Sequence, residues 1–274
     1  MKSYSSLVFA ALCALLLAPA GEVVAQGSTP IDFEVPRASV LVGPVIGVNR
    51  NFHTGGFRTI TADESCPIFE KGSGWGFLAG ITAEILLGES WSIIPRLTYE
   101  SRPGSFTSEL PDALVLIPGP NGQNNQIVTQ TVTAASEVTY SLVNMEVMYK
   151  QEIADLGGMR IGVAAGPAFG VVIGGNNRQV QDLVEPQNAR FTNPQNFPTE
   201  NSGRRLIFFD GDIPDRSGTR FSLKAGLQAE VGLFGNAWIM TPGLYYDYGL
   251  TDVTGAENWQ LSTLMFMVDF RRAF

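Results

Sequence analysis

Eight segments of this chain alternate apolar and polar side chains with a period of two, and that alternation restricts the fold more than any other feature. A period of two is typical of a β-strand with one apolar and one polar face. In FSLKAGLQAEVGL, for example, Phe221, Leu223 and Ala225 point to one side and the residues between them to the other. The predicted strands are residues 38–50, 74–87, 91–101, 138–150, 159–173, 219–233, 237–250 and 259–274.

The connections between these strands are alternately short and long. The short ones are the turns GES, QEIADLGG and GNA, and the long ones span residues 52–73, 102–136, 174–217 and 251–258. Strict alternation is the pattern of outer membrane barrels, which have short periplasmic turns and longer external loops. We therefore expect an all-β fold in which residues 38–274 form an eight-stranded antiparallel up-and-down transmembrane β-barrel, with both termini in the periplasm.

Composition favours a membrane barrel over the alternative, a soluble barrel or sandwich. Apolar residues make up 45% of the chain and charged residues only 16%, yet beyond the N-terminal stretch no segment is apolar enough for a membrane helix. Only helices and closed barrels satisfy every backbone polar group in lipid. The net charge of -8 argues against nucleic acid as a partner, because nucleic acid is bound by basic surfaces. We expect the outer membrane of a Gram-negative bacterium as the location and its lipid as the surroundings.

The N-terminus has the features of a secretory signal peptide. Lys2 precedes the apolar stretch LVFAALCALLLAPA, and the short residues Val23 and Ala25 predict cleavage after Ala25. A membrane anchor is the alternative, but the apolar run is only about fourteen residues where a membrane-spanning helix needs about twenty. Residues 1–25 are therefore predicted to be a signal peptide, and residues 26–37 a periplasmic N-terminal segment.

Aromatic residues cluster at the ends of the predicted strands. Membrane barrels carry aromatic girdles at both headgroup levels, since these rings have one apolar and one polar side. The expected girdle residues are Trp75, Tyr99, Tyr140, Tyr248 and Trp259 at the external ends, and Trp91, Tyr149, Trp238 and Phe274 at the periplasmic ends.

The inward faces of the predicted strands carry as many acids as bases. Charges enclosed in a narrow space need partners, so we expect a paired network that crosses the lumen. Eight strands enclose a space that side chains can fill, which predicts a plugged barrel rather than an open diffusion pore. The predicted network consists of Glu84, Glu100, Glu146, Glu230, Asp247 and Asp269 with Arg96, Lys150, Arg160, Arg220, Lys224 and Arg271.

Two segments carry a family resemblance. GWGFLAGITAEILLGESWSIIPRLTYESRPGSF, with Pro95, Leu97 and Tyr99, and TPGLYYDYGLTDV resemble hairpins of the Bacteroidetes-type outer membrane β-barrel domain, the group that includes PorT-like proteins and small barrels of the OmpA and OmpX kind. The resemblance implies the barrel fold and membership of an envelope or secretion assembly. It covers most of residues 38–274, and its short motifs mark the fold, not an activity.

The C-terminal stretch LMFMVDFRRAF resembles the signal by which the barrel-assembly machinery recognises a last strand. Its alternating residues are Phe266, Val268 and Phe270, and its terminal aromatic is Phe274. The resemblance implies the assembly machinery as a partner during insertion.

Residues suited to chemistry are few. His53 shares the first long connection with Asp63 and Ser65, a combination that surface lipid-modifying or hydrolytic barrels use, although nothing in the sequence fixes their geometry. Cys66 is the one cysteine outside the signal peptide, and is an inert residue, a free thiol or an attachment point. We expect a protein that is not an enzyme and holds no cofactor.

The stretch FDGDIPDRSG resembles a degraded calcium loop. Asp210, Asp212 and Asp215 supply the alternating carboxylates that hard cations prefer, but one glycine of the pattern is missing. An ordinary Asp/Gly/Pro turn is the alternative.

The connections 102–136 and 174–217 are too long to be simple turns, and are rich in Asn, Gln, Pro and Gly. They are candidate binding sites for a protein partner, or passive cover over the barrel mouth. The leading expectation is a non-enzymatic interaction protein of the outer membrane. A narrow channel and a surface lipid-modifying enzyme are the alternatives.

Overall fold

The computed structural model describes residues 40–58, 68–117, 126–183, 189–191, 197–233, 238–255 and 258–273. These residues belong to one compact unit. Among them, no helix has the length and hydropathy needed to span a bilayer. The predicted signal peptide (1–25), the predicted segment 26–37 and Asp63, Ser65, Cys66 and Phe274 lie outside the described residues.

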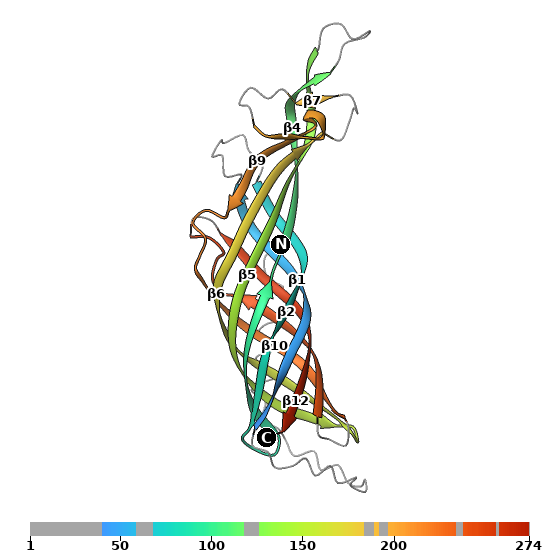
Figure 1. Ribbon diagram of the computed structural model, residues 1–274, viewed down its shortest axis with the longest axis vertical. Helices are drawn as coiled ribbons and strands as arrows, with labels where there is room; N and C mark the ends of the chain where they lie inside the picture. The colour runs from blue at the N-terminus through green and yellow to red at the C-terminus, as the bar shows by residue number, and fades with distance from the viewer. Residues whose placement is uncertain are drawn as a thin grey trace, which may run out of the picture. The chain divides into compact units, whose positions relative to one another are not determined.

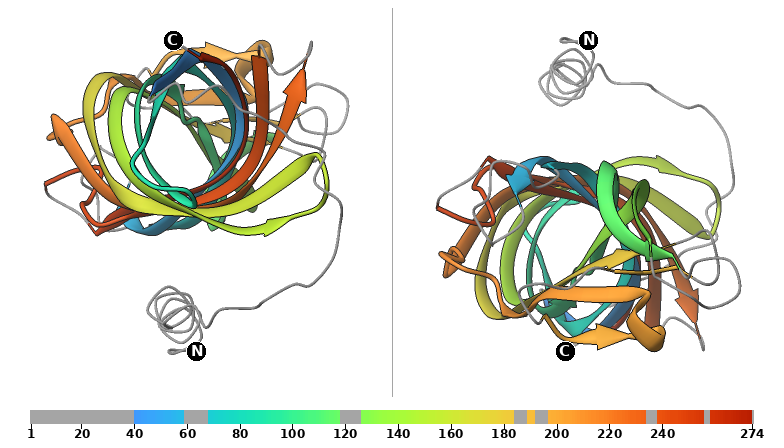
Figure 2. Two further views of the ribbon diagram at one scale, coloured as in Figure 1. Left: turned by 90° about the horizontal axis from the view of Figure 1, so that it is seen from below. Right: turned by 90° about the horizontal axis from the view of Figure 1, so that it is seen from above.

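Eight of the described strands form a closed ring in chain order. Each pairs antiparallel with the strand before and after it, and the pairing of the first with the last closes the barrel. Figure 2 looks along this ring from both ends. The predicted eight-stranded antiparallel barrel is confirmed. Its strands are β1 (Val40–Arg58), β2 (Ile68–Leu86), β3 (Trp91–Ser101), β5 (Gln126–Asp155), β6 (Met159–Asp182), β10 (Thr219–Leu233), β11 (Trp238–Gly249) and β12 (Trp259–Ala273).

Side chains alternate across the barrel wall, as the period of two requires. In β3 and β11 every second residue is buried in the lumen and the residues between are more exposed. The outward residues of the lower wall are apolar, which matches a lipid-facing band. Members of this band include Val42, Ile46, Val48, Phe77, Ile81, Leu97, Met145, Val147, Leu227, Leu244 and Phe266.

The connections predicted as loops 102–136 and 174–217 are largely β-structure, which corrects the sequence prediction. β5 begins at Gln126 rather than residue 138, and β6 continues to Asp182 rather than residue 173. The hairpin partner of β5 is β4 (Gly104–Ile117), which also pairs with β2 at its base. Further short elements are β7 (Arg190–Phe191), β8 (Thr199–Glu200), the 3-10 helix η2 (Asn201–Gly203) and β9 (Arg205–Asp212).

These extra strands prolong the wall at one end of the barrel, called here the external end. Figure 1 shows β4, β7 and β9 at the end opposite to the lower end of β12. The first long connection is also shorter than predicted, because β1 runs on to Arg58 and β2 begins at Ile68. The predicted strands are too short because the alternation of apolar and polar residues ends at the lipid-facing band. Above the band most outward residues of β5 and β6 are polar.

The buried apolar residues of the external end form two clusters. The apolar cap lies just above the lipid-facing band. Its residues come from β2, β4, β5, β6 and β12, from the segment before β10 and from the segment after β11. A distal cluster joins β4 and β5 to β7 and β9. The members of the apolar cap are Phe69, Phe106, Ala134, Val138, Tyr140, Leu142, Val172, Ile213, Val253, Trp259 and Leu261.

Candidate functional site

The lumen below the apolar cap holds a chain of ion pairs that alternates acid and base. At the periplasmic end, Arg160 Nη2 lies 3.0 Å from Glu230 Oε2. Glu230 also pairs with Lys150, whose Nζ lies 2.8 Å from Glu84 Oε1. Glu84 in turn pairs with Arg271. The strands β2, β5, β6, β10 and β12 are thereby linked across the interior.

The chain continues through the middle of the barrel. Arg271 Nη2 lies 3.1 Å from Asp269 Oδ2, and the same oxygen is 2.9 Å from Arg96 Nη2. Arg96 also pairs with Glu146 on β5, and Glu146 pairs with Lys224 on β10. Each carboxylate in this part therefore lies between two cations.

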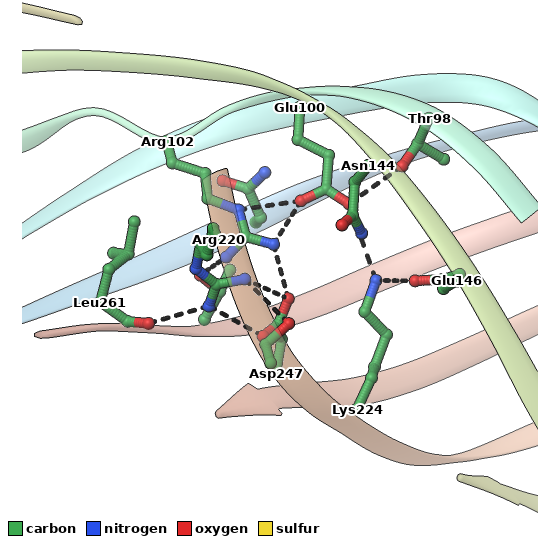
Figure 3. A network of polar contacts seen from close by, with 12 residues as sticks. Thr98, Glu100, Arg102, Asn144, Glu146, Arg220, Lys224, Asp247 and Leu261 are labelled. Carbon is green, nitrogen blue, oxygen red and sulfur yellow. Dashed lines mark hydrogen bonds and ion pairs between the residues drawn. The ribbon is translucent and has the colours of Figure 1, made fainter. Parts of the chain in front are cut away.

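At the external end the chain runs through two more arginines, Arg102 and Arg220 (Figure 3). Lys224 Nζ lies 3.6 Å from Glu100 Oε1, and Glu100 pairs with Arg102. Arg102 Nη2 lies 2.6 Å from Asp247 Oδ2, and Asp247 Oδ1 is 2.9 Å from Arg220 Nη2. All twelve side chains predicted to form the network are thus part of one connected chain that spans the charged section of the lumen.

Arg102 is the functional residue that the sequence analysis missed. It follows β3 and was placed in the loop 102–136, but its side chain turns into the lumen and is fully buried. Its backbone N–H donates to the carbonyl of Tyr140 (2.6 Å), which holds this turn against β5. Thr98 and Glu100 are alternate residues that point into the lumen, and extending this alternation by two residues would have identified Arg102. The predicted network already contained equal numbers of acids and bases, so no excess charge indicated that a further residue belonged to it.

Glu152 is a second addition, at the periplasmic rim. It lies in the segment predicted as the turn QEIADLGG, and its Oε1 is 3.2 Å from Arg160 Nη1. With Arg102 and Glu152 included, the chain again holds equal numbers of acids and bases. Balance matters because a buried charge without a partner costs several kcal/mol.

The apolar cap encloses His53, which corrects its predicted place in an external loop. His53 lies on β1 and is buried. Its Nδ1 accepts a hydrogen bond from Trp259 Nε1 (3.1 Å), so the proton of the neutral ring is on Nε2, which lies 3.3 Å from the carbonyl oxygen of Pro103. The ring also packs edge-on against Phe106 at 5.4 Å between centroids. Both ring nitrogens are therefore occupied, and the ring serves as packing.

The predicted aromatic girdles are correct in most positions and wrong in two. Trp75, Tyr99 and Tyr248 are exposed near the external ends, and Trp91, Tyr149 and Trp238 near the periplasmic ends. Tyr140 and Trp259 are each only 1% exposed and belong to the apolar cap. They lie above the lipid-facing band, where the inward face is apolar and takes up the rings.

The three aspartates of the degraded calcium loop do not converge. Asp210 and Asp212 are exposed on β9, and Asp215 lies in the following turn with φ 48°. Asp210 Oδ2 is 3.7 Å from Arg178 Nε, a cation rather than a metal site. Within the described ranges, no group of three His, Cys, Asp or Glu side chains is arranged to hold a metal ion.

The last strand places the predicted assembly residues on the outer face. Phe266 is exposed, and Val268 and Phe270 are partly exposed along the same side of β12. These side chains contact lipid in the folded barrel. Their role as a signal for the assembly machinery stays a prediction.

A family model described as "Outer membrane protein beta-barrel domain" matches residues 25–255. No curated protein sequence matches this chain at a significant level. Among solved structures, Neisserial surface protein A is 12% identical, with a TM-score of 0.38 over 85% of this chain and 99% of that chain.

Two further solved structures are of the same degree of likeness. Ail, the attachment invasion locus protein of Yersinia pestis, is 10% identical with a TM-score of 0.33, over 85% of this chain and 99% of its own. The outer membrane protease OmpT from Escherichia coli is 7% identical with a TM-score of 0.37, over 86% and 96%. Similarity of this degree carries no conclusion about activity.

Proposed function

Because the chain belongs to the outer membrane protein β-barrel domain family, an assignment that places it in the outer membrane of a Gram-negative bacterium, we propose that it is a non-enzymatic interaction protein with a closed lumen. The observation that carries this proposal is the continuous chain of ion pairs, with the apolar cap above it. Together they occupy the interior at the levels where a diffusing solute would pass.

The external strands supply the surface for interaction. β4, β5, β6 and β9 extend beyond the lipid-facing band and have their own distal cluster, so they form a stable wall rather than mobile cover. Arg178 Nη2 is 2.7 Å from Glu200 Oε1, and Arg205 Nε is 2.6 Å from Asp182 Oδ1, which fixes the polar face of this wall. A rigid, polar, exposed sheet suits recognition of a protein partner.

Conductance tests the closed lumen. The refolded protein, with the barrel verified by heat-shifted gel mobility, is placed in planar bilayers and single-channel current is recorded. The proposal expects no stepwise current from a folded barrel. Steady steps would contradict it.

A narrow channel is the second candidate, and three buried polar atoms favour it. The side-chain hydroxyls of Thr82 and Thr241 and the amide nitrogen of Gln228 have no hydrogen-bond partner among the described residues, although they lie in the lumen. Such atoms suit a file of water beside the ion pairs. Stepwise current in the bilayer experiment would move this function to first place.

Site-specific crosslinking tests the interaction surface in cells. A photoreactive residue replaces Ile127, which is 63% exposed on the external part of β5. The matched control replaces Leu156, which is 62% exposed in the periplasmic turn. Adducts with a protein only from position 127 support an external partner. Adducts only from position 156 would instead support the alternative implied by the resemblance to PorT-like proteins, in which the periplasmic side joins an envelope assembly. Adducts from neither position would contradict both proposals.

A further inference from the structure

Arg50 lies on the outer face of the barrel among lipid-facing residues. Arg50 lies between the buried Asn49 and Asn51 on β1, so its side chain projects outward from the barrel wall. Its neighbours on that face are Val48, which is 49% exposed, and Phe52, which is 39% exposed. A cation between two lipid-exposed apolar side chains costs free energy unless it finds an anion.

The described residues hold Arg50 in place without giving it a carboxylate partner. Its Nη2 donates to Ser73 Oγ (2.7 Å), and its guanidinium carbon lies 5.3 Å from the centre of the Trp75 ring. Trp75 is itself 67% exposed, and it is the direct cross-strand neighbour of Arg50. No carboxylate of the described residues forms an ion pair with Arg50. The guanidinium is thus oriented by a hydroxyl and a ring, with its charge left for an external anion.

A second arginine and tryptophan pair gives the depth of this site. Arg272 on β12 lies 6.0 Å from the Trp238 ring, again as direct cross-strand neighbours, near the periplasmic end. Leu264 on β12 is the partner of Arg50, and it precedes Arg272 by eight residues. Eight residues span about 27 Å along a strand, or ~20 Å across the membrane at the usual strand tilt. The two pairs therefore bracket the apolar band, and Arg50 lies at the level of the outer-leaflet headgroups.

A further cation lies on the same face of the hairpin, nearer its external end. Lys71 follows the same outward parity on β2 as Ser73 and Trp75, and its side chain is exposed. Its cross-strand neighbour is Thr54, four residues along β1 from Arg50. A guanidinium, a hydroxyl and an ammonium thus follow one another along the outer face of this hairpin, with the Trp75 ring beside the guanidinium and apolar residues below it.

We propose that Arg50, Ser73 and Lys71 bind a phosphate group of an outer-leaflet lipid, with its acyl chains along Trp75 and Val48. Charge complementarity favours an anion, and the apolar residues that surround Arg50 favour an anion that carries hydrocarbon chains. Free inorganic phosphate would leave those apolar contacts unused. The site depends only on the barrel's place in the outer membrane, and does not depend on whether the lumen is closed or which partner the external sheet binds.

Native mass spectrometry of the folded barrel tests this site. The full protein is refolded with lipid A that carries both phosphates, delipidated stepwise, and compared with the same protein refolded with dephosphorylated lipid A. Wild type should retain the phosphorylated lipid at least about fivefold more strongly, because each cation near a membrane surface contributes a factor of about that size. Equal retention of the two lipids by wild type would overturn the proposal without any variant.

Substitutions then locate the site. Arg50→Gln should lose the preference for phosphorylated lipid, and Arg50→Lys should keep part of it. The matched control is Arg272→Gln, which removes the equivalent stacked arginine from the opposite leaflet and should leave the preference unchanged. Loss of the preference in Arg272→Gln but not in Arg50→Gln would contradict the proposal. Inorganic phosphate at millimolar concentration should not displace the lipid, and full displacement would identify free phosphate as the ligand.

Discussion

The lower and upper parts of the barrel interior are filled in different ways. Below, within the lipid-facing band, the lumen holds the chain of ion pairs together with a small apolar cluster that includes Met148, Tyr245 and Met267. Above, it holds the apolar cap. β5 contributes to both with one unbroken alternation, since Val138 and Tyr140 point inward in the upper part, and Glu146 and Lys150 in the lower part.

This difference teaches that the medium outside the wall decides what can lie inside it. In the lower part the outer face must be apolar because it contacts lipid, and the polar residues that remain must face the lumen and pair there. In the upper part the outer face is in water, so the hydrophobic effect drives apolar side chains inward, as in a soluble protein. One strand therefore changes its pattern of polarity without changing its parity.

The largest expected loss of stability comes from removing Arg102 from the chain of ion pairs. Arg102→Leu leaves Glu100 and Asp247 with one cation fewer in a buried site, which should lower the free energy of unfolding by about 3–5 kcal/mol. The folded fraction against urea, measured by heat-shifted gel mobility, gives this value. Arg178→Leu, in a partly exposed pair of the external sheet, is the control and should cost at most about 1 kcal/mol. Equal losses in the two variants would show that the lumen charges are not coupled as described.

Glu84→Gln is a milder test of the same chain. Lys150 and Arg271 keep Glu230 and Asp269 as partners, so the expected loss is smaller, about 2–3 kcal/mol. The urea midpoint of the refolded protein measures it. Glu109→Gln, at an exposed position on β4, should leave the midpoint unchanged. Unchanged stability of Glu84→Gln would count against a paired network.

Trp259→Phe tests the apolar cap at the hydrogen bond between Trp259 and His53. The ring is retained in large part, but His53 Nδ1 loses its donor, and an unsatisfied buried acceptor should cost about 1–3 kcal/mol. Denaturation in urea again gives the value. Trp238→Phe, on the outer face, should change stability less. A larger effect at position 238 would mean that lipid contacts outweigh the packing of the cap.

The smallest effect is expected in the external sheet, at Arg205. Its hydrogen bonds to Asp182 raise the pKa of Arg205 above its usual value, but both side chains are partly exposed. Arg205→Ala should therefore cost at most about 1 kcal/mol, and the cost should shrink at high salt. Urea denaturation at low and high salt concentration measures both. A loss as large as that of Arg102→Leu would show that the external sheet is as tightly coupled as the lumen.

The sequence predicted the ring of strands and the members of the charged network with few errors. Most of its errors lie above the lipid-facing band, and Glu152 at the periplasmic rim is the exception. Arg102, Tyr140 and Trp259 were assigned to a loop or to the outer face because the expected pattern of apolar-out and polar-in was applied where it no longer holds. His53 was assigned to a loop for the same reason, since β1 continues past the segment with outward apolar residues.

The sequence by itself determined the barrel, because alternation with a period of two sets the face of each residue along the regular part of a strand, and alternating connection lengths set the order of the strands. It also determined which charges face the lumen, since parity is a local property. Only the tertiary structure decided which acid meets which base, because those pairs join strands as far apart in the chain as Glu84 and Arg271. It also decided where the lipid-facing band ends, because that boundary depends on the medium outside the wall and not on the strand itself.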